Sequence, residues 1–147
     1  MRVLGIDYGR KRVGLALSDA SGMLARPWKT IEASGIERQA AALAREIEIL
    51  AAELDGLDVI VIGLPRRLSG EPNDQTPIVQ TLAVQLATMT SIPIALQDER
   101  LTSREAESLL SRREKDWRKR KPLLDAASAA VILQDYLDAQ PRNQHSL

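Results

Sequence analysis

An unbroken apolar run at residues 59–62, Val-Ile-Val-Ile, constrains the fold of this chain most strongly. A strand that is apolar at every position is typical of a parallel sheet covered by helices on both faces. Gly63 and Pro65 end the run, and a helical pattern precedes it. The apolar residues of that pattern recur at spacings of three and four: Ile36, Ala40, Leu43, Ile47, Leu50 and Leu54. We therefore expect an α/β fold in which the run is a central strand and this helix covers one face of the sheet.

The remaining elements complete a mixed sheet. Apolar segments at residues 3–8 and 13–18 flank a basic turn and predict an antiparallel hairpin. Pro27 and Pro93 place two further strands at sheet edges, because proline cannot donate to a ladder. We expect five strands in the order 3-2-1-4-5, flanked by helices. The edge strands are predicted over 25–31 and 92–97, and the other helices over 78–89, 102–113 (with a Thr102 and Glu105 capping box) and 123–139.

Length and composition indicate one domain. We expect the 147 residues to form a single domain over 1–139 with a flexible C-terminal tail at 140–147. The absence of cysteine excludes disulfides and zinc–thiolate sites. No apolar run approaches the ~20 residues of a membrane span, and no signal peptide precedes the first strand. These features fit a reducing compartment, and they indicate no membrane partner.

Charge is balanced in total but uneven along the chain. The 20 Lys and Arg residues match 20 Asp and Glu residues, yet seven of the ten residues at 112–121 are basic. Smaller basic patches lie at 10–12 and 66–67. Local patches of this kind attract a polyanion whatever the total charge. Aromatic residues are only 3% of the chain, which argues against an extended base-stacking surface.

Asp7 is a single carboxylate near the end of an apolar strand. Burying a carboxylate is costly unless a partner compensates its charge. A metal ion or a phosphate-handling site would explain the residue. A carboxylate that fixes the following turn through backbone hydrogen bonds would explain it equally well. This segment alone leaves both explanations open.

Three other segments have the same two kinds of explanation. Asp98 and Glu99 follow the fifth predicted strand, where ligands bind in open α/β sheets, but they also suit a solvated loop. Asp125 lies near the start of the last helix, where the helix dipole alone favours an acid. The loop at 63–70 has glycines and two arginines that could hold a phosphate backbone, or it could be a plain connection.

Taken together, the acids have a common explanation. One strand separates strands 1 and 5 in the expected order, so their axes lie roughly 10 Å apart. Carboxylates from both strands and from a nearby helix could hold two divalent cations about 3.5–4 Å apart, an arrangement that supports phosphodiester hydrolysis. His145, the single histidine, lies in the predicted tail, so a histidine-based mechanism is disfavoured.

Four motifs follow one another along the chain. They are GIDYG at 5–9 with RVGLA at 12–16, VIGLP at 61–65 with Gly70, DERLTS at 98–103 with Glu105 and Ala106, and DAA at 125–127 with ILQ at 132–134 and Tyr136-Leu137. In this order the motifs resemble the YqgF family, also called the RuvX-type pre-16S rRNA nuclease or Holliday junction resolvase family. The resemblance covers almost the whole chain, from Val3 to about Asp138. One departure is the stretch Arg-Arg-Leu-Ser at 66–69, which replaces a more usual polar turn that contains asparagine.

The resemblance implies an RNase H-like fold in a cytoplasmic bacterial nuclease that needs Mg²⁺ or Mn²⁺. The family's acids match Asp7, Glu99 and Asp125, which would be both catalytic residues and metal ligands, with Asp98 as the alternative to Glu99. The expected partner is structured RNA or branched DNA, within a pre-ribosomal particle if it is RNA, and the protein would be a monomer or a weak homodimer. The residues expected to bind nucleic acid are all basic: Arg10, Lys11, Arg12, Arg66, Arg67, Arg100, Arg118, Lys119, Arg120 and Lys121.

Maturation of the 5′ end of pre-16S rRNA is the leading functional hypothesis. A Holliday junction resolvase is the second, and its paired cuts require a twofold dimer. A third is a nucleic-acid-binding module without turnover. A fourth is one half of an ATPase, since Asp-x-Gly turns also occur in the phosphate loops of actin-like folds. Those folds bind nucleotide between two such domains, and a chain of 147 residues offers only one.

Overall fold

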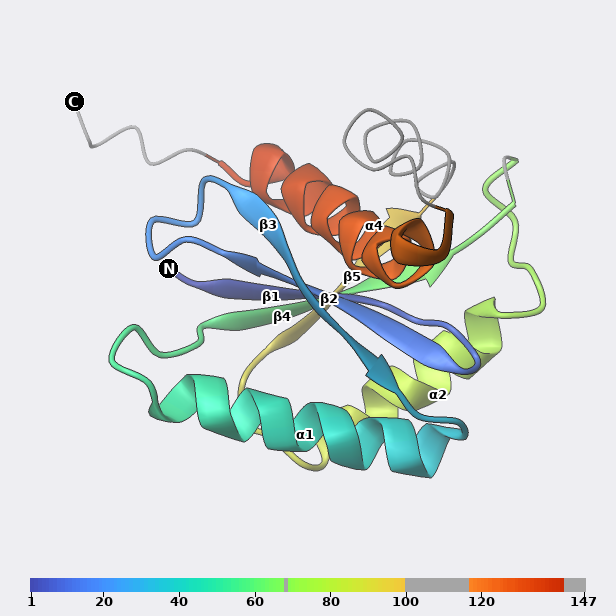
Figure 1. The fold of residues 1–147 in the computed structure, drawn as a ribbon, viewed down its shortest axis with the longest axis horizontal. Helices are drawn as coiled ribbons and strands as arrows, with labels where there is room; N and C mark the ends of the chain where they lie inside the picture. The colour runs from blue at the N-terminus through green and yellow to red at the C-terminus, as the bar shows by residue number, and fades with distance from the viewer. Residues whose placement is uncertain (68, 100–116, 142–147) are drawn as a thin grey trace.

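A five-stranded mixed sheet with helices on both faces forms the molecule (Figure 1). The computed structural model describes residues 1–67, 69–99 and 117–141. The strand order is β3-β2-β1-β4-β5, as predicted from the sequence. The strands are β1 (Val3–Asp7), β2 (Arg12–Ser18), β3 (Ala25–Glu32), β4 (Val59–Pro65) and β5 (Ile94–Glu99). The helices are α1 (Ile36–Ala52), α2 (Thr76–Ala87) and α4 (Trp117–Ala139).

The direction of each strand follows from its connection. The hairpin makes β1 and β2 antiparallel, and β3 adds to β2 in the same way. The helices α1 and α2 carry the chain back across the sheet, so β1, β4 and β5 are parallel. The carboxyl ends of these three strands therefore lie at the same end of the sheet. Pro27 lies in the edge strand β3, and Pro93 directly precedes the other edge strand, β5. The register of β2 and β3 shifts between Leu15 and Ala16, where Pro27 joins the ladder.

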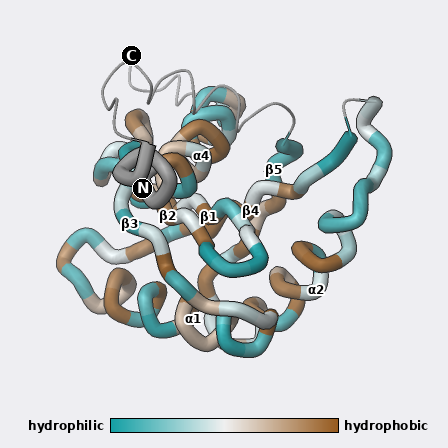
Figure 2. The backbone as a smooth tube through the Cα atoms, turned by 45° about the vertical axis from the view of Figure 1, so that its right-hand side comes forward, coloured by the Kyte–Doolittle hydropathy of each residue, from teal (hydrophilic) through white to brown (hydrophobic). Residues whose placement is uncertain are grey.

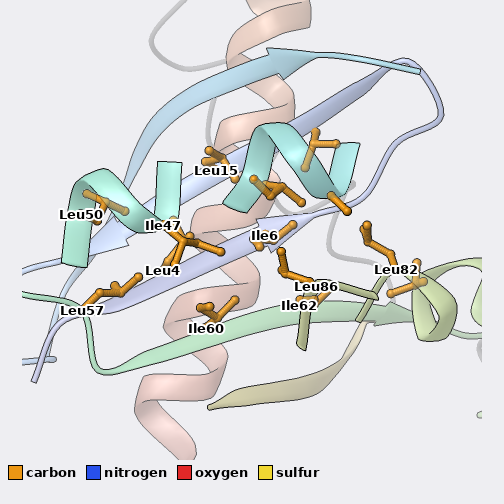
Figure 3. Close-up of a cluster of buried hydrophobic side chains, with 14 of the residues drawn as sticks. Leu4, Ile6, Leu15, Ile47, Leu50, Leu57, Ile60, Ile62, Leu82 and Leu86 are labelled. Carbon is orange, nitrogen blue, oxygen red and sulfur yellow. The ribbon is translucent and has the colours of Figure 1, made fainter. Parts of the chain in front are cut away.

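The face of the sheet that carries α1 and α2 holds the larger apolar core (Figure 3). In this core Ile47 and Leu50 of α1, with Leu82 and Leu86 of α2, pack against alternate residues of the strands. One prediction was wrong: Leu54 is fully exposed, because α1 ends at Ala52 before the chain turns toward β4. The buried strand residues of this face are Leu4, Ile6, Val13, Leu15, Ile60, Ile62 and Leu64.

Helix α4 covers the opposite face and lies unusually close to it. A Cβ built on Gly5 would lie 2.7 Å from the Cβ of Leu133, and one on Gly63 would lie 2.5 Å from Cδ1 of Ile132. Real Cβ atoms essentially never come that close, so a side chain at Gly5 would displace the helix, whereas one at Gly63 would first displace the flexible end of Ile132. The glycines therefore let α4 settle onto the strands, where it buries Val3, Ala16 and Val61.

Some boundaries differ from the predictions. Strand β5 extends two residues further than predicted, so Asp98 and Glu99 lie in the strand and not in a loop after it. Helix α4 begins at Trp117 and contains Pro122, although a proline favours the first turn. Helix α2 begins at Thr76, where Asn73 Oδ1 accepts hydrogen bonds from the first backbone N–H groups. The helix predicted at 102–113 lies outside the described residues.

Within the described part of the chain, no helix combines the length and apolar character needed to cross a membrane.

Candidate metal centre at the carboxyl ends of the strands

Asp7 and Glu99 end two parallel strands and face the same side of the sheet. Asp7 is the last residue of β1, and Glu99 is the last residue of β5. Alternation along each strand turns both side chains toward α4. Strand β4 lies between them and contributes Gly63, where a Cβ would lie 3.0 Å from Oε2 of Glu99. The glycine thus leaves room for the Glu99 carboxylate to reach across β4 toward Asp7.

The electrostatics of the pair show how close the acids are. Burial raises the pKa of Asp7 well above its usual value, and the charges of Glu99 and Asp125 raise it further. A hydrogen bond between the side chains of Asp7 and Glu99 adds to this rise in the pKa of Asp7. Burial also raises the pKa of Glu99, against the opposing effect of the hydrogen bond with Asp7. The pKa values of both acids are therefore raised, because burial disfavours the charged form of each and Asp7 also lies near two other negative charges.

Asp125 comes to the same place from helix α4. Figure 1 shows the N-terminal half of α4 crossing the sheet near the ends of β1 and β4. A Cβ on Gly14 would lie 1.9 Å from the backbone oxygen of Asp125, so this turn of the helix lies directly on β2. Oδ2 of Asp125 forms an ion pair with Nε of Arg12, at 3.2 Å. The structure therefore brings all three predicted acids together from β1, β5 and α4.

Asp98 lies on the other face of β5. Its side chain pairs with Arg66, with Nε 2.8 Å from Oδ1. Arg66 also donates from Nη1 to the backbone oxygen of Gly70, at 3.0 Å, and its own N–H reaches the carbonyl of Glu99. Asp98 thus anchors the segment after β4 to the edge strand. Since β5 extends through both acids, only Glu99 points toward Asp7.

The donor set suits a hard divalent cation, although it is not arranged as a finished ligand cage. Among the described residues, no three His, Cys, Asp or Glu side chains are placed to hold a metal ion as they stand. The contacts explain this: Asp7 is hydrogen-bonded to Glu99, and Asp125 is engaged by Arg12. Among the described residues, the three partly buried carboxylates outnumber the Arg12 guanidinium that pairs with one of them, and a divalent cation would neutralise the excess negative charge. The residues present therefore fit such an ion once these contacts are exchanged.

Gln39 supports the site from helix α1, although the sequence did not predict it as a site residue. Its side chain is 1% exposed in α1, and Nε2 donates to the backbone oxygens of Gly9 at 2.7 Å, Ala33 at 3.0 Å and Arg10 at 3.3 Å. It thereby fixes the β1–β2 turn that follows Asp7. The signal was present in the sequence: Gln39 interrupts an apolar stripe three residues after Ile36.

Comparison with known protein families places the chain. A family model described as "RuvX: Holliday junction resolvase" matches residues 1–139. The chain belongs to the RuvX family. This confirms the resemblance seen in the four sequence motifs.

Relatives of this RuvX-family chain match it over nearly their whole length. A protein of Chloroflexus aurantiacus is 38% identical over 148 residues, which covers 99% of this chain and 94% of the relative. A Bacillus subtilis protein is 37% identical over 139 residues, covering 95% and 99%. Both carry the name "Putative pre-16S rRNA nuclease".

Solved structures that resemble this RuvX-family chain share its fold. Thermus thermophilus RuvC in complex with a Holliday junction substrate aligns with a TM-score of 0.54 at 14% identity, over 95% of this chain and 94% of the other. The fowlpox virus resolvase with Holliday junction DNA aligns with a TM-score of 0.58 at 11% identity, over 95% and 98%. These likenesses confirm the RNase H-like fold class.

Basic side chains of the RuvX-family chain lie beside the acids. Figure 2 shows a hydrophilic turn between β1 and β2 and a hydrophilic segment between β4 and α2. The turn carries the exposed Arg10 and Lys11, while the segment carries Arg67, also exposed. Arg12 and Arg66 are half-buried because each pairs with an acid. Of the other predicted residues, Arg100 lies outside the described residues, and Arg118, Lys119, Arg120 and Lys121 belong to turns of α4 whose side chains are not described.

Proposed function

We propose that this chain is a divalent-metal-dependent nuclease in which Asp7, Glu99 and Asp125 hold Mg²⁺ or Mn²⁺ in the cytoplasm. The observation that carries this proposal is the convergence of three acids from β1, β5 and α4, close enough to raise the pKa of Asp7 together. Carboxylates crowded in this way at the carboxyl ends of parallel strands are typical of a functional site. A structural role alone does not account for the cost of placing three acids together.

Each residue would have a defined part in hydrolysis. Asp7 and Glu99, once ionised, would supply oxygen ligands from the sheet, and Asp125 would supply them from the helix. A bound divalent cation provides positive charge for the attacking and leaving oxygens of a phosphodiester. The exposed Arg10, Lys11 and Arg67 would contact backbone phosphates on either side and orient the strand across the acids.

The substrate we propose is structured RNA, with cleavage at the 5′ end of pre-16S rRNA. This rests on the names of full-length relatives, which are 37–38% identical to the chain. A Holliday junction resolvase is the second candidate, because the family model carries that description. Symmetric cleavage of a junction requires two active sites, and hence a twofold dimer in solution.

The deciding experiment offers both substrates to one enzyme preparation. Purified protein in Mg²⁺ or Mn²⁺ is given precursor 16S rRNA and a synthetic four-way junction side by side. We expect cleavage of the RNA by the wild type and none by Asp7→Asn, which keeps the side-chain shape but loses the charge. Undiminished cleavage by Asp7→Asn would refute the site. Paired cuts in the junction by a dimeric protein, with the RNA left intact, would favour the resolvase.

A further inference from the structure

Arg12 differs from the other basic residues of the β1–β2 turn because its side chain points inward. Arg10 and Lys11 are exposed, whereas the Arg12 side chain is 28% exposed and meets Asp125, which is 30% exposed. Strand alternation explains the direction, since Arg12 shares the α4-facing side of β2 with Gly14 and Ala16. A basic residue at this position therefore reaches the acids and not the solvent.

The contact of Arg12 with Asp125 competes with a metal ion. Nε of Arg12 lies 3.2 Å from Oδ2 of Asp125, whereas Mg²⁺ binds carboxylate oxygens at about 2.0–2.1 Å. A guanidinium in that position occupies the coordination space on one side of the carboxylate. Its positive charge also opposes the approach of a second cation. Arg12 and a metal ion therefore compete for this oxygen of Asp125, because each positive charge weakens the binding of the other.

Arg12 also has an alternative partner of the right chemistry. It directly follows the two exposed basic residues of the β1–β2 turn, whose backbone Gln39 holds in place at Gly9 and Arg10. The planar fork of a guanidinium matches a phosphate as well as it matches a carboxylate. Once released from Asp125, Arg12 would be beside a nucleic acid bound on this turn.

We propose that Arg12 is an internal counter-cation of Asp125, which a divalent metal displaces, and that the released guanidinium then binds a phosphate of the nucleic acid. This inference rests on the proposed nuclease function and adds a positioning residue to it. Binding of the metal and binding of the nucleic acid then favour each other, because each requires Arg12 to separate from Asp125. By linkage, the coupling is reciprocal.

The first test measures metal affinity without nucleic acid. Mn²⁺ is titrated into metal-free wild type, Arg12→Gln and Lys11→Gln by isothermal titration calorimetry. Lys11→Gln is the matched control, because it removes one positive charge from the same turn without touching an acid. We expect Arg12→Gln to bind Mn²⁺ roughly three- to tenfold more tightly, the size expected for a half-buried ion pair, and Lys11→Gln to change by less than about twofold. Unchanged or weaker binding by Arg12→Gln would overturn the proposal.

A second variant keeps the test decisive if Arg12→Gln fails to fold. Arg12→Lys retains the positive charge, so its affinity for Mn²⁺ should stay close to that of the wild type. In the wild-type chain, the Nε–H nuclear magnetic resonance signal of Arg12, assigned by its loss in Arg12→Lys, should shift as Mg²⁺ is added. A signal that stays fixed while Mg²⁺ binds would contradict displacement.

The coupling to nucleic acid is tested separately. A fluorescent RNA hairpin is titrated with and without Ca²⁺, and a gel confirms that the probe stays intact. We expect Ca²⁺ to tighten binding by the wild type about fivefold and to have little effect on Arg12→Gln. Lys11→Gln should weaken binding equally in both buffers. A full Ca²⁺ effect in Arg12→Gln would overturn the second half of the proposal.

The two levels of the proposal fail in different ways. If the wild type binds no divalent cation and cuts neither substrate, the proposed function is wrong and the role of Arg12 is wrong with it. If the wild type binds Mn²⁺ and cleaves RNA while Arg12→Gln has unchanged Mn²⁺ affinity, only the role of Arg12 is wrong.

Discussion

A Cβ on Gly14 would lie 1.9 Å from the backbone carbonyl oxygen of Asp125, and 2.9 Å from the next amide nitrogen. Gly14 is also the residue directly opposite Asp7 in the ladder between β1 and β2. The helix turn that carries one acid is therefore in contact with the strand position beside another. The spacing between these two acids depends on the absence of a side chain at Gly14.

We expect Gly14→Ala to displace α4 and to damage the candidate site as well as the fold. The clash is with backbone atoms, which cannot move aside as a flexible side chain can. Overpacking of this kind costs about 1–3 kcal/mol of unfolding free energy. Urea denaturation measures the loss of stability, and Mn²⁺ titration of the folded fraction should show weaker binding.

Gly56→Ala is the control for Gly14→Ala. Gly56 has φ 64° and open space around its Cβ position. Alanine there costs roughly 1–2 kcal/mol through the left-handed backbone alone, far from the acids. Both variants should lose comparable stability, but only Gly14→Ala should lose Mn²⁺ affinity. Equal Mn²⁺ affinity in the two would show that the contact with Asp125 does not set the site.

Asp7→Asn should stabilise the metal-free protein, and the gain should depend on pH. The folded chain raises the pKa of Asp7 well above the value of 3.8 that applies in the unfolded chain. Between the two pKa values the folded state keeps a proton that the unfolded state releases, so wild-type stability falls as pH rises. Asparagine removes this loss. We expect little difference near pH 4 and a gain of about 0.5–2 kcal/mol at pH 8.

The measurement is urea denaturation in EDTA at pH 4, 6 and 8. Asp55→Asn is the control, since Asp55 is exposed in the turn after α1. A gain for Asp7→Asn that stays constant across pH would mean that the ionisation of Asp7 does not strain the fold.

Glu99 and Asp98 are neighbours with different roles, and substitutions should separate them. Glu99→Gln should lower cleavage by about 10²-fold or more, the loss expected for one group that stabilises charge. Asp98→Asn breaks a pair in which the acid is 55% exposed, so it should cost less than about 1 kcal/mol and keep the metal affinity of the wild type. Cleavage assays and Mn²⁺ titration on both variants check this. Loss of metal binding in Asp98→Asn alone would reverse the assignment.

Gln39→Leu should loosen the turn that follows Asp7. The substitution removes hydrogen bonds to the backbone oxygens of Gly9, Arg10 and Ala33, and leaves these partly buried acceptors with fewer donors. We expect a loss of about 1–3 kcal/mol in unfolding free energy and faster amide hydrogen exchange at residues 8–11. Gln80→Leu, on the exposed side of α2, should change neither measurement. Unaltered exchange in the turn would remove Gln39 from the site.

Arg10 and Lys11 should contribute to nucleic-acid binding through charge alone. Each neutral substitution, Arg10→Gln or Lys11→Gln, should weaken binding across RNA sequences and reduce the slope of log affinity against log salt by about 1. Fluorescence anisotropy at several KCl concentrations measures the slope. Lys29→Gln is the control, because Lys29 pairs with Glu46 of α1 on the opposite face. A slope equal to the wild type for both Arg10→Gln and Lys11→Gln would exclude the turn from the interface.

The sheet order could be predicted because each strand carries a local signal. The apolar run of β4 marks a strand that is buried on both faces, and Pro27 and Pro93 mark the two edges. The end of β5 could not be predicted in the same way. Its last residues are polar, since an edge strand at a site is only partly buried, and they read as a loop. Because the strand was predicted to end at residue 97, the sequence could not show which face of the sheet Asp98 and Glu99 each occupy.

The acids of the site could be proposed from the sequence, but their contacts could not. Arg12 and Asp125 lie 113 positions apart, and no local pattern links them. Arg66 was predicted to bind phosphate from a basic loop, yet its guanidinium forms an ion pair with Asp98. Pairings of this kind depend on how α4 and the segment after β4 settle on the sheet, which is a property of tertiary packing.

The position of Asp125 on the last helix has a consequence for the newly made chain. Residues up to β5 can bury the core between the sheet and α1 and α2 as soon as they leave the ribosome. The opposite face, with Val3, Ala16 and Val61, stays open until α4 docks. The acid cluster is then complete for the first time. A chain still in synthesis therefore carries two of its acids without the third, and its capacity to cut nucleic acid would begin only after α4 has been made and has docked on the sheet.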